Sequence, residues 1–275
     1  MDPSAILDTS SGVSVYQNLI DRFIQSGYAS GTDLFTAPYD WRLDLASSTG
    51  RLDAVVQAAR AKSPTGKVSI IAHSLGGLLA KEYLRQSGDT SFVDKLVLVG
   101  VPELGSPKTF KALTYGDDFG IKKFGLGLNE LEMKKIGQNM PAVYELLPSR
   151  SYLTAVGKYI LDFTSGAVRS LDYNQSKEFM LRWPDDSRNP VLLTRADEFH
   201  EAIDSVGFNV PADSIYRLVG CQNPATIGDI RVYPKGKFEI DPIDGDGTVP
   251  LGSAIHSVSA HNYFALYGTT RINHM

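Results

Sequence analysis

The sequence predicts an α/β fold, and three observations support this prediction. Two runs rich in β-branched and aliphatic residues, 68–72 and 95–99, have the length and composition of buried strands. Segments with apolar residues at helical spacing lie beside them, which indicates a mostly parallel sheet with helices on both faces. The chain has 275 residues, 43% of them hydrophobic, and can therefore bury a large core.

The elements before the second buried strand follow from apolar spacing and chain breakers. An apolar stripe predicts a helix over residues 13–26, which ends at Gly27. Leu34–Ala37 predicts a short strand, and the apolar positions of 52–59 predict a second helix. A third helix is expected between the two buried strands.

The pattern changes at residue 106. Residues 106–190 contain short helical pieces rich in aromatic residues and no clear buried strand, as expected of a cap inserted into the sheet. A helix over 195–206 then leads to a strand from Ile215, and 231–240 alternates about a Pro/Gly turn, as in a peripheral hairpin. A final strand is expected at 263–267. The predicted division is a first part of the core at 1–105, a cap or lid at 106–190 and a second part of the core at 191–275.

Composition excludes several classes of function. The net charge is −4 and no basic block is present, so nucleic acid is not an expected partner. Cys221 is the single cysteine and is expected at a buried strand end, which excludes an internal disulfide. The sequence has no His-Glu-x-x-His set, and neither a metal nor a cofactor is expected. It also has no signal peptide or apolar run of about 18 residues, and it leaves the cellular location open.

The segment Lys67–Gly77 is the strongest functional signal. A strand breaks there at Ser74, which is flanked by small residues and followed by a helix, as in a nucleophile elbow. A tight turn of this kind presents the serine Oγ to a base that can take its proton. Ala72 stands where such motifs usually have glycine, while Gly76 and Gly77 leave room for the turn and for close helix packing.

A downstream turn, Asp241–Pro250, supplies the candidate acid. An α/β-hydrolase has its serine, acid and histidine in this chain order, and the acid fixes the histidine tautomer. Asp246, directly before Gly-Thr-Val, is the first choice and Asp244 the second. An ordinary Asp-Gly turn and a calcium loop are the alternatives. Calcium is disfavoured because Thr248 stands where an EF-hand loop needs an acidic or amide ligand.

The candidate base is one of three histidines near the end of the chain. His256 and His261 lie 10 and 15 residues beyond Asp246, which leaves little room for a strand and a return loop, whereas His274 follows the expected final strand. His73, beside the serine, is expected to pack the elbow, because adjacent side chains on a tight turn diverge. His200 is given no role.

Three motifs occurring in this order resemble the lecithin:cholesterol acyltransferase family with its phospholipase and bacterial relatives. They are Ala37–Arg42, Ala72–Gly77 and Asp244–Pro250; Gly100–Pro107 and Tyr144–Ser149 also resemble segments of bacterial members. The resemblance implies an α/β-hydrolase fold and a triad of Ser74, Asp246 and His274.

The resemblance also implies that the segment Pro38–Arg42 lies near the acyl site. In the structural interpretation of the same segment, Pro38 fixes a turn, Trp41 packs, and Asp40 pairs with Arg42 or with the backbone.

The oxyanion hole differs from the family pattern. The family places a strand and a glycine-containing loop before the first helix, and that loop donates one of two oxyanion N–H groups. The N–H of Leu75 is the other donor, and loss of one donor costs about 2.7 to 4 kcal/mol. This chain begins after the point where that loop is expected, and we therefore expect it to be a fragment of a longer protein.

The function expected from these features is lipid acyl-ester hydrolysis or acyl transfer through an acyl-enzyme. Glycines alternate with apolar residues in 119–128, as in a lid that touches a lipid surface, although packing of a cap turn explains this pattern equally well. A water-soluble carboxylesterase or amidase on the same scaffold is one alternative. An inactive binding domain that lacks its oxyanion loop is the other.

Overall fold

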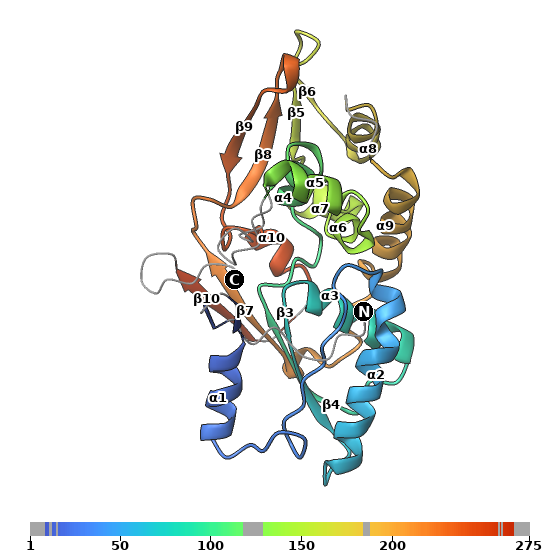
Figure 1. The fold of residues 1–275 in the computed structure, drawn as a ribbon, viewed down its shortest axis with the longest axis vertical. Helices are drawn as coiled ribbons and strands as arrows, with labels where there is room; N and C mark the ends of the chain where they lie inside the picture. Colours follow the sequence, from blue (N-terminus) through green and yellow to red (C-terminus); the bar gives the residue numbers. More distant parts are fainter. Residues whose placement is uncertain are drawn as a thin grey trace.

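A computed structural model describes residues 9–10, 13–14, 16–117, 129–183, 188–257, 259 and 261–266. Two four-stranded sheets organise these residues, with a short two-stranded pair, β1 (Thr9–Ser10) and β2 (Val13–Ser14), near the start (Figure 1). Within the described residues no helix is both long and apolar enough to cross a membrane.

The first sheet is entirely parallel and has the strand order β10-β7-β4-β3. Its strands are β3 (Val68–His73), β4 (Val93–Val99), β7 (Ile215–Cys221) and β10 (His261–Leu266). The predicted α/β class and mostly parallel sheet are therefore confirmed. Cys221 is the buried last residue of β7, as expected.

Helices pack against one face of this sheet. They are α2 (Leu45–Lys62), α3 (Leu75–Ser87) and α9 (Pro190–Ile203), which lie together on one side of the sheet in Figure 1. Their side chains enclose Leu96 and Leu98 of β4, which are 0% and 2% exposed. On the other face Ile71, Leu218 and Tyr263 are 44%, 45% and 57% exposed. The two faces are thus covered unequally.

The second sheet has the order β6-β5-β8-β9 and its own hydrophobic core. Its strands are β5 (Ile160–Asp162), β6 (Arg169–Ser170), β8 (Ile227–Val232) and β9 (Phe238–Pro242), of which β5 and β8 pair in parallel. Short helices surround it: α4 (Pro107–Thr114), α5 (Glu130–Gly137), α6 (Pro141–Glu145), α7 (Arg150–Ala155) and α8 (Tyr173–Leu181). The helices α1 (Gln17–Gln25) and α10 (Leu251–Ala254) complete the fold.

Four local predictions were wrong. The helix expected over 195–206 spans Pro190–Ile203 instead. The first helix begins at Gln17 rather than at residue 13, and Leu34–Ala37 forms no strand but only a single bridge from Leu34 to Ser30. The strands β5 and β6 lie in the region where none was expected, because they are too short to show a period of two. The hairpin at 231–240 is confirmed as β8 and β9, yet it is joined to β5 in a sheet. The division at residues 105 and 190 stays a prediction.

Candidate active site

Ser74 lies at the turn between β3 and α3 with an unusual backbone conformation. Its φ is 51° and its ψ is −127°, a region that costs a non-glycine residue about 1 to 3 kcal/mol. Its N–H donates to the carbonyl of Val99 at the end of the neighbouring strand β4, at 2.9 Å. The predicted strand–serine–helix arrangement is therefore present, with the strain that is typical of a nucleophile elbow.

Close packing of α3 holds this turn in place. A Cβ on Gly77 would lie 2.3 Å from Cγ2 of Val101, so only glycine fits at this position. A Cβ on Gly76 would meet only ordinary contact, with the Tyr39 hydroxyl at 3.8 Å. Of the two glycines, Gly77 is thus the one that the packing requires.

The start of α3 suits an oxyanion. Leu75 is the first residue of this helix, and the first N–H groups of a helix have no acceptor within the helix itself. The helix dipole adds partial positive charge at the same end. A negative charge next to Ser74 would be favoured at this end of the helix, and the Leu75 N–H as its donor stays a prediction.

Two tyrosines that were not expected as site residues lie beside the elbow. The Tyr16 hydroxyl is 2.8 Å from Nδ1 of His73, and the two rings meet edge to face. This contact supports the expected packing role for His73. Burial, with a contribution from nearby Tyr16, raises the pKa of Tyr39. Tyr39 belongs to the Pro-Tyr-Asp-Trp-Arg motif, which was the available signal, whereas nothing in the sequence marked Tyr16.

The rest of that motif forms a local ion pair. Arg42 donates from Nε to Oδ1 of Asp40 at 2.7 Å and from Nη2 to Oδ2 at 2.6 Å. The hydrogen bond from Arg42 lowers the pKa of Asp40 to about 2. Trp41, which packs in the structural interpretation of this segment, is 49% exposed. These contacts agree with a structural role for Asp40 and Arg42.

The two candidate acids differ sharply in environment. Asp246 is 5% exposed, and its Oδ1 accepts hydrogen bonds from the backbone N–H groups of Thr248 (2.9 Å) and Val249 (2.7 Å). Asn223 Nδ2 donates to the Asp246 carbonyl at 3.1 Å. Asp244 is exposed. The structure thus places one buried and oriented carboxylate in this turn.

Asp246 lies at the same sheet edge as Ser74. A Cβ on Gly220, near the end of β7, would be 2.5 Å from Cβ of Asp246, so the acid packs directly against that strand end. Strand β4 alone separates β7 from β3. Two strand spacings amount to about 10 Å, and parallel strands end at one edge. The acid and the serine turn therefore lie at the same edge of the sheet, two strands apart.

The histidines divide into described and undescribed residues. His274 lies outside the described residues, as does the expected lid at 119–128. His261 begins β10 and stacks on Tyr216 with ring centroids 4.4 Å apart, and His256 is exposed. His200 is buried, with Nε2 2.8 Å from the Glu145 carbonyl oxygen. Among the described ranges, no cluster of three or more His, Cys, Asp or Glu side chains could hold a metal ion.

A buried charge cluster lies behind the elbow helix, and the sequence did not reveal it. Oε1 of Glu103 accepts hydrogen bonds from Nε and Nη2 of Arg217, at 3.0 and 2.9 Å. Oε2 accepts one from the Ser257 hydroxyl at 2.5 Å, and Lys81 Nζ of α3 lies 3.9 Å away. Burial lowers the pKa of Lys81. This cluster ties α3, the end of β4, β7 and the approach to β10 together.

A second buried group joins the two cores. The carboxylate of Glu145 accepts a hydrogen bond from the backbone N–H of Leu45, at 3.2 Å to Oε2. Burial, reinforced by the charge of Asp44, raises the pKa of Glu145 to about 8. The Glu145 side chain thus links α6 to the first turn of α2. Its protonation state depends on pH.

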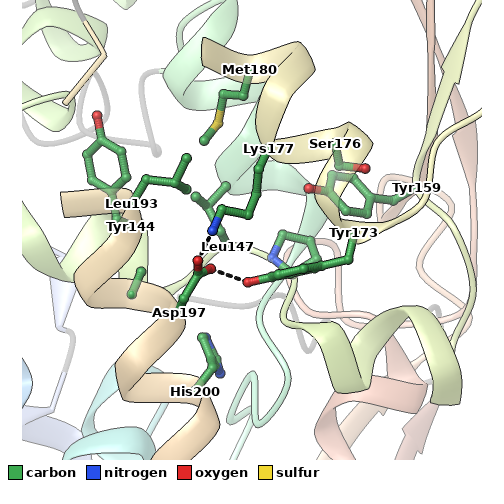
Figure 2. A pocket seen from close by; sticks show the side chains of 12 residues that line it. Tyr144, Leu147, Tyr159, Tyr173, Ser176, Lys177, Met180, Leu193, Asp197 and His200 are labelled. Atoms are coloured by element: carbon green, nitrogen blue, oxygen red, sulfur yellow. Dashed lines mark hydrogen bonds and ion pairs between the residues drawn. The ribbon is translucent and has the colours of Figure 1, made fainter. Parts of the chain in front are cut away.

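A small cavity lies between α8 and α9, away from the elbow (Figure 2). It offers about 20 Å³ to the centre of a water molecule, room for about one water. Asp197 points into it and contacts both Lys177 and the Tyr173 hydroxyl. Neither Ser74 nor Asp246 lines this cavity. It is therefore a packing feature of the second core.

Comparison with known proteins gives a family and several relatives. The sequence profile of the lecithin:cholesterol acyltransferase family matches residues 1–197. The chain is 25% identical over 304 residues to an Arabidopsis thaliana protein named Phospholipase A(1) LCAT3, covering 92% of this chain and 66% of that protein. It is also 25% identical to the Canis lupus familiaris Lysosomal phospholipase A and acyltransferase, covering 93% of this chain and 60% of the relative. The chain thus spans about 60% to 66% of the length of these two relatives.

A solved structure shares the fold. It is described as the crystal structure of the Tle4-Tli4 complex, and it superposes with a TM-score of 0.61 at 19% identity. The match covers 83% of this chain and 60% of the other. At this identity the likeness concerns the fold alone.

Proposed function

This chain belongs to the lecithin:cholesterol acyltransferase family, and from that premise we propose that it is a serine-dependent hydrolase or acyltransferase of lipid acyl esters. The observation that carries the proposal is Ser74, held in a strained conformation between β3 and α3. A buried Asp246 lies at the same sheet edge, which supports a triad chemistry. The relatives named as phospholipases and acyltransferases support a lipid ester as the substrate.

The proposed roles follow from the positions of Ser74, Leu75 and Asp246 and, for His274, from the resemblance to the family. His274 takes the proton of Ser74 Oγ as that oxygen attacks the ester carbonyl. The N–H of Leu75 donates to the oxyanion. Asp246 orients the imidazole and stabilises its charged form. His274 then gives the proton to the departing alcohol, which leaves an acyl-enzyme on Ser74.

The second half-reaction decides between hydrolysis and transfer. Water attacking the acyl-enzyme releases a fatty acid, and a second alcohol accepts the acyl group instead. In either case His274 activates the attacking oxygen and returns the proton to Ser74. A hydrolase and an acyltransferase thus share every residue proposed here.

The first test is covalent labelling of Ser74. The chain and its Ser74→Ala variant are treated with a fluorophosphonate, and their intact masses are compared. We expect one adduct on the parent chain and none on the variant. If a folded parent chain carries no adduct, activated-serine chemistry is wrong for this chain and the binding-domain alternative gains support.

The lipid preference needs a separate assay. A series of p-nitrophenyl esters of increasing acyl length, followed by phospholipid vesicles, measures how kcat/KM changes with chain length. A rise with acyl length and turnover of vesicles support the lipid substrate. Activity confined to short, soluble esters or amides would instead favour a water-soluble carboxylesterase or amidase.

A further inference from the structure

The segment Gly100–Pro107 connects β4 to α4 and contacts the loop that carries Asp246. We call residues 244–254 the acid loop. Ser106 Oγ donates to the carbonyl of Thr248 at 2.5 Å. Lys108 Nζ approaches Oγ1 of the same Thr248 at 3.3 Å. The strand next to the elbow strand thus leads directly into contacts with the acid loop.

A second anchor lies on the far side of the same loop. Ser253 Oγ accepts a hydrogen bond from the N–H of Leu104 at 3.0 Å and donates to the carbonyl of Gly105 at 2.8 Å. Ser253 is 0% exposed and Ser106 is 3% exposed, so bulk water does not replace these bonds when they are lost. The middle of the acid loop, at Thr248, and its last turn, at Ser253, are therefore both fixed to one segment.

That segment is itself held by the chain around residue 147. Ser106 N–H donates to the carbonyl of Leu146 at 2.9 Å. Gly105 has a φ of 86°, and a Cβ there would lie 2.1 Å from the carbonyl oxygen of Leu147, so glycine alone fits. The segment behind the acid loop is thus held in turn by a hydrogen bond to Leu146 and by close packing against Leu147.

These contacts lead to the carboxylate in two steps. Ser106 fixes the carbonyl of Thr248, and the N–H groups of Thr248 and Val249 hold Oδ1 of Asp246. We infer that Ser106 is a positioning residue for Asp246, with Ser253 as its second anchor. This inference rests on the proposed function, in which Asp246 orients the catalytic histidine.

The expected consequence is kinetic. A catalytic group that is misplaced by about 1 Å can cost about 10²-fold in rate. Removal of one of the two anchors should cost less, about tenfold in the rate of fluorophosphonate labelling of Ser74. A misoriented Asp246 also stabilises the imidazolium less, which lowers the pKa of the histidine. The acid limb of the labelling profile should therefore move to lower pH.

The test compares Ser106→Ala and Ser253→Ala with the control Thr114→Val. Thr114 lies on α4, is 2% exposed and donates to the Phe110 carbonyl at 2.7 Å, so the control loses an equally buried hydroxyl that does not touch the acid loop. Because Ser106 also caps α4 through the Lys108 N–H, Ser106→Thr, which keeps the hydroxyl, serves as the rescue variant. The two readouts are amide hydrogen exchange of the peptide 244–254 and the labelling rate as a function of pH.

Either readout can overturn the inference. We expect faster exchange of 244–254 and slower labelling with a shifted acid limb in both alanine variants, and parent-like behaviour in Thr114→Val and Ser106→Thr. Unchanged exchange in Ser106→Ala overturns the inference whether or not the chain is active. Faster exchange with a parent-like labelling rate overturns it as well. If the parent itself is not labelled, the proposed function fails, and the positioning role of Ser106 in catalysis fails with it. If the parent is labelled and the variants behave like it, the positioning role alone is refuted.

Discussion

The packing at Gly77 gives a prediction with a built-in control. In Gly77→Ala the new Cβ would lie 2.3 Å from Cγ2 of Val101, which is 2% exposed. Ordinary carbon contacts begin at about 3.5 Å, so the two groups must separate by roughly 1.2 Å in a closed core. Overpacking of this kind costs about 1 to 3 kcal/mol, against a gain of about 1 kcal/mol in helix propensity. We expect a net loss of up to about 2 kcal/mol.

The neighbouring Gly76→Ala is the matched control. Its Cβ meets the Tyr39 hydroxyl at 3.8 Å, an ordinary contact, so this variant should be as stable as the parent or up to about 1 kcal/mol more stable. Urea unfolding of both variants measures the difference. A cycle with Val101→Ala should show a coupling of about 1 kcal/mol or more, because the smaller side chain relieves the clash. Equal midpoints for the two alanine variants, with no coupling to Val101, would refute the packing argument.

Two further predictions concern the buried charges. The pKa of Glu145 is raised to about 8 by burial first, so the folded chain holds a proton that the unfolded chain releases near pH 4.5, and stability falls as pH rises from about 4.5 to 8. Glu145→Gln should flatten this pH dependence and raise the melting temperature at pH 8.5. Thermal melts of the variant at pH 5 and pH 8.5 test this, and a pH dependence equal to that of the parent would contradict the prediction. Arg217→Met removes the two hydrogen bonds to Glu103 and should cost about 3 to 5 kcal/mol. Lys81→Met should cost less, because Nζ is 3.9 Å from Glu103 and its buried charge is penalised; the two urea midpoints in the reverse order would be evidence against this account.

Local sequence signals were reliable where one element carried the whole pattern. The run before Ser74 predicted β3, the spacing after it predicted α3, and the two glycines predicted a tight junction that Gly77 does provide. Signals failed where the structure depended on distant partners. The strand β5 has three residues and exists because β8, more than sixty positions later, supplies its parallel neighbour.

The candidate site shows the same division. Spacing and motif selected Ser74, Asp246 ahead of Asp244, and His274, and the catalytic roles of all three stay predictions. The buried side chain of Asp246, its two amide donors and the contacts from Ser106 and Ser253 could not be predicted, because each joins residues whose separation the sequence leaves open. The expected packing of Trp41 was wrong as well, since this side chain is 49% exposed.

The sequence by itself determined which residues form the elbow, because strain, small residues and helical spacing are local properties of a short segment. It also determined the α/β class, because the alternation of strand and helix patterns can be recognised along the sequence. Only the tertiary structure decided which carboxylate is buried at the serine's sheet edge and what holds it there. The reason is physical. The contacts between β4, β7 and the acid loop join segments that are far apart in the sequence, and the energy of each contact depends on both partners.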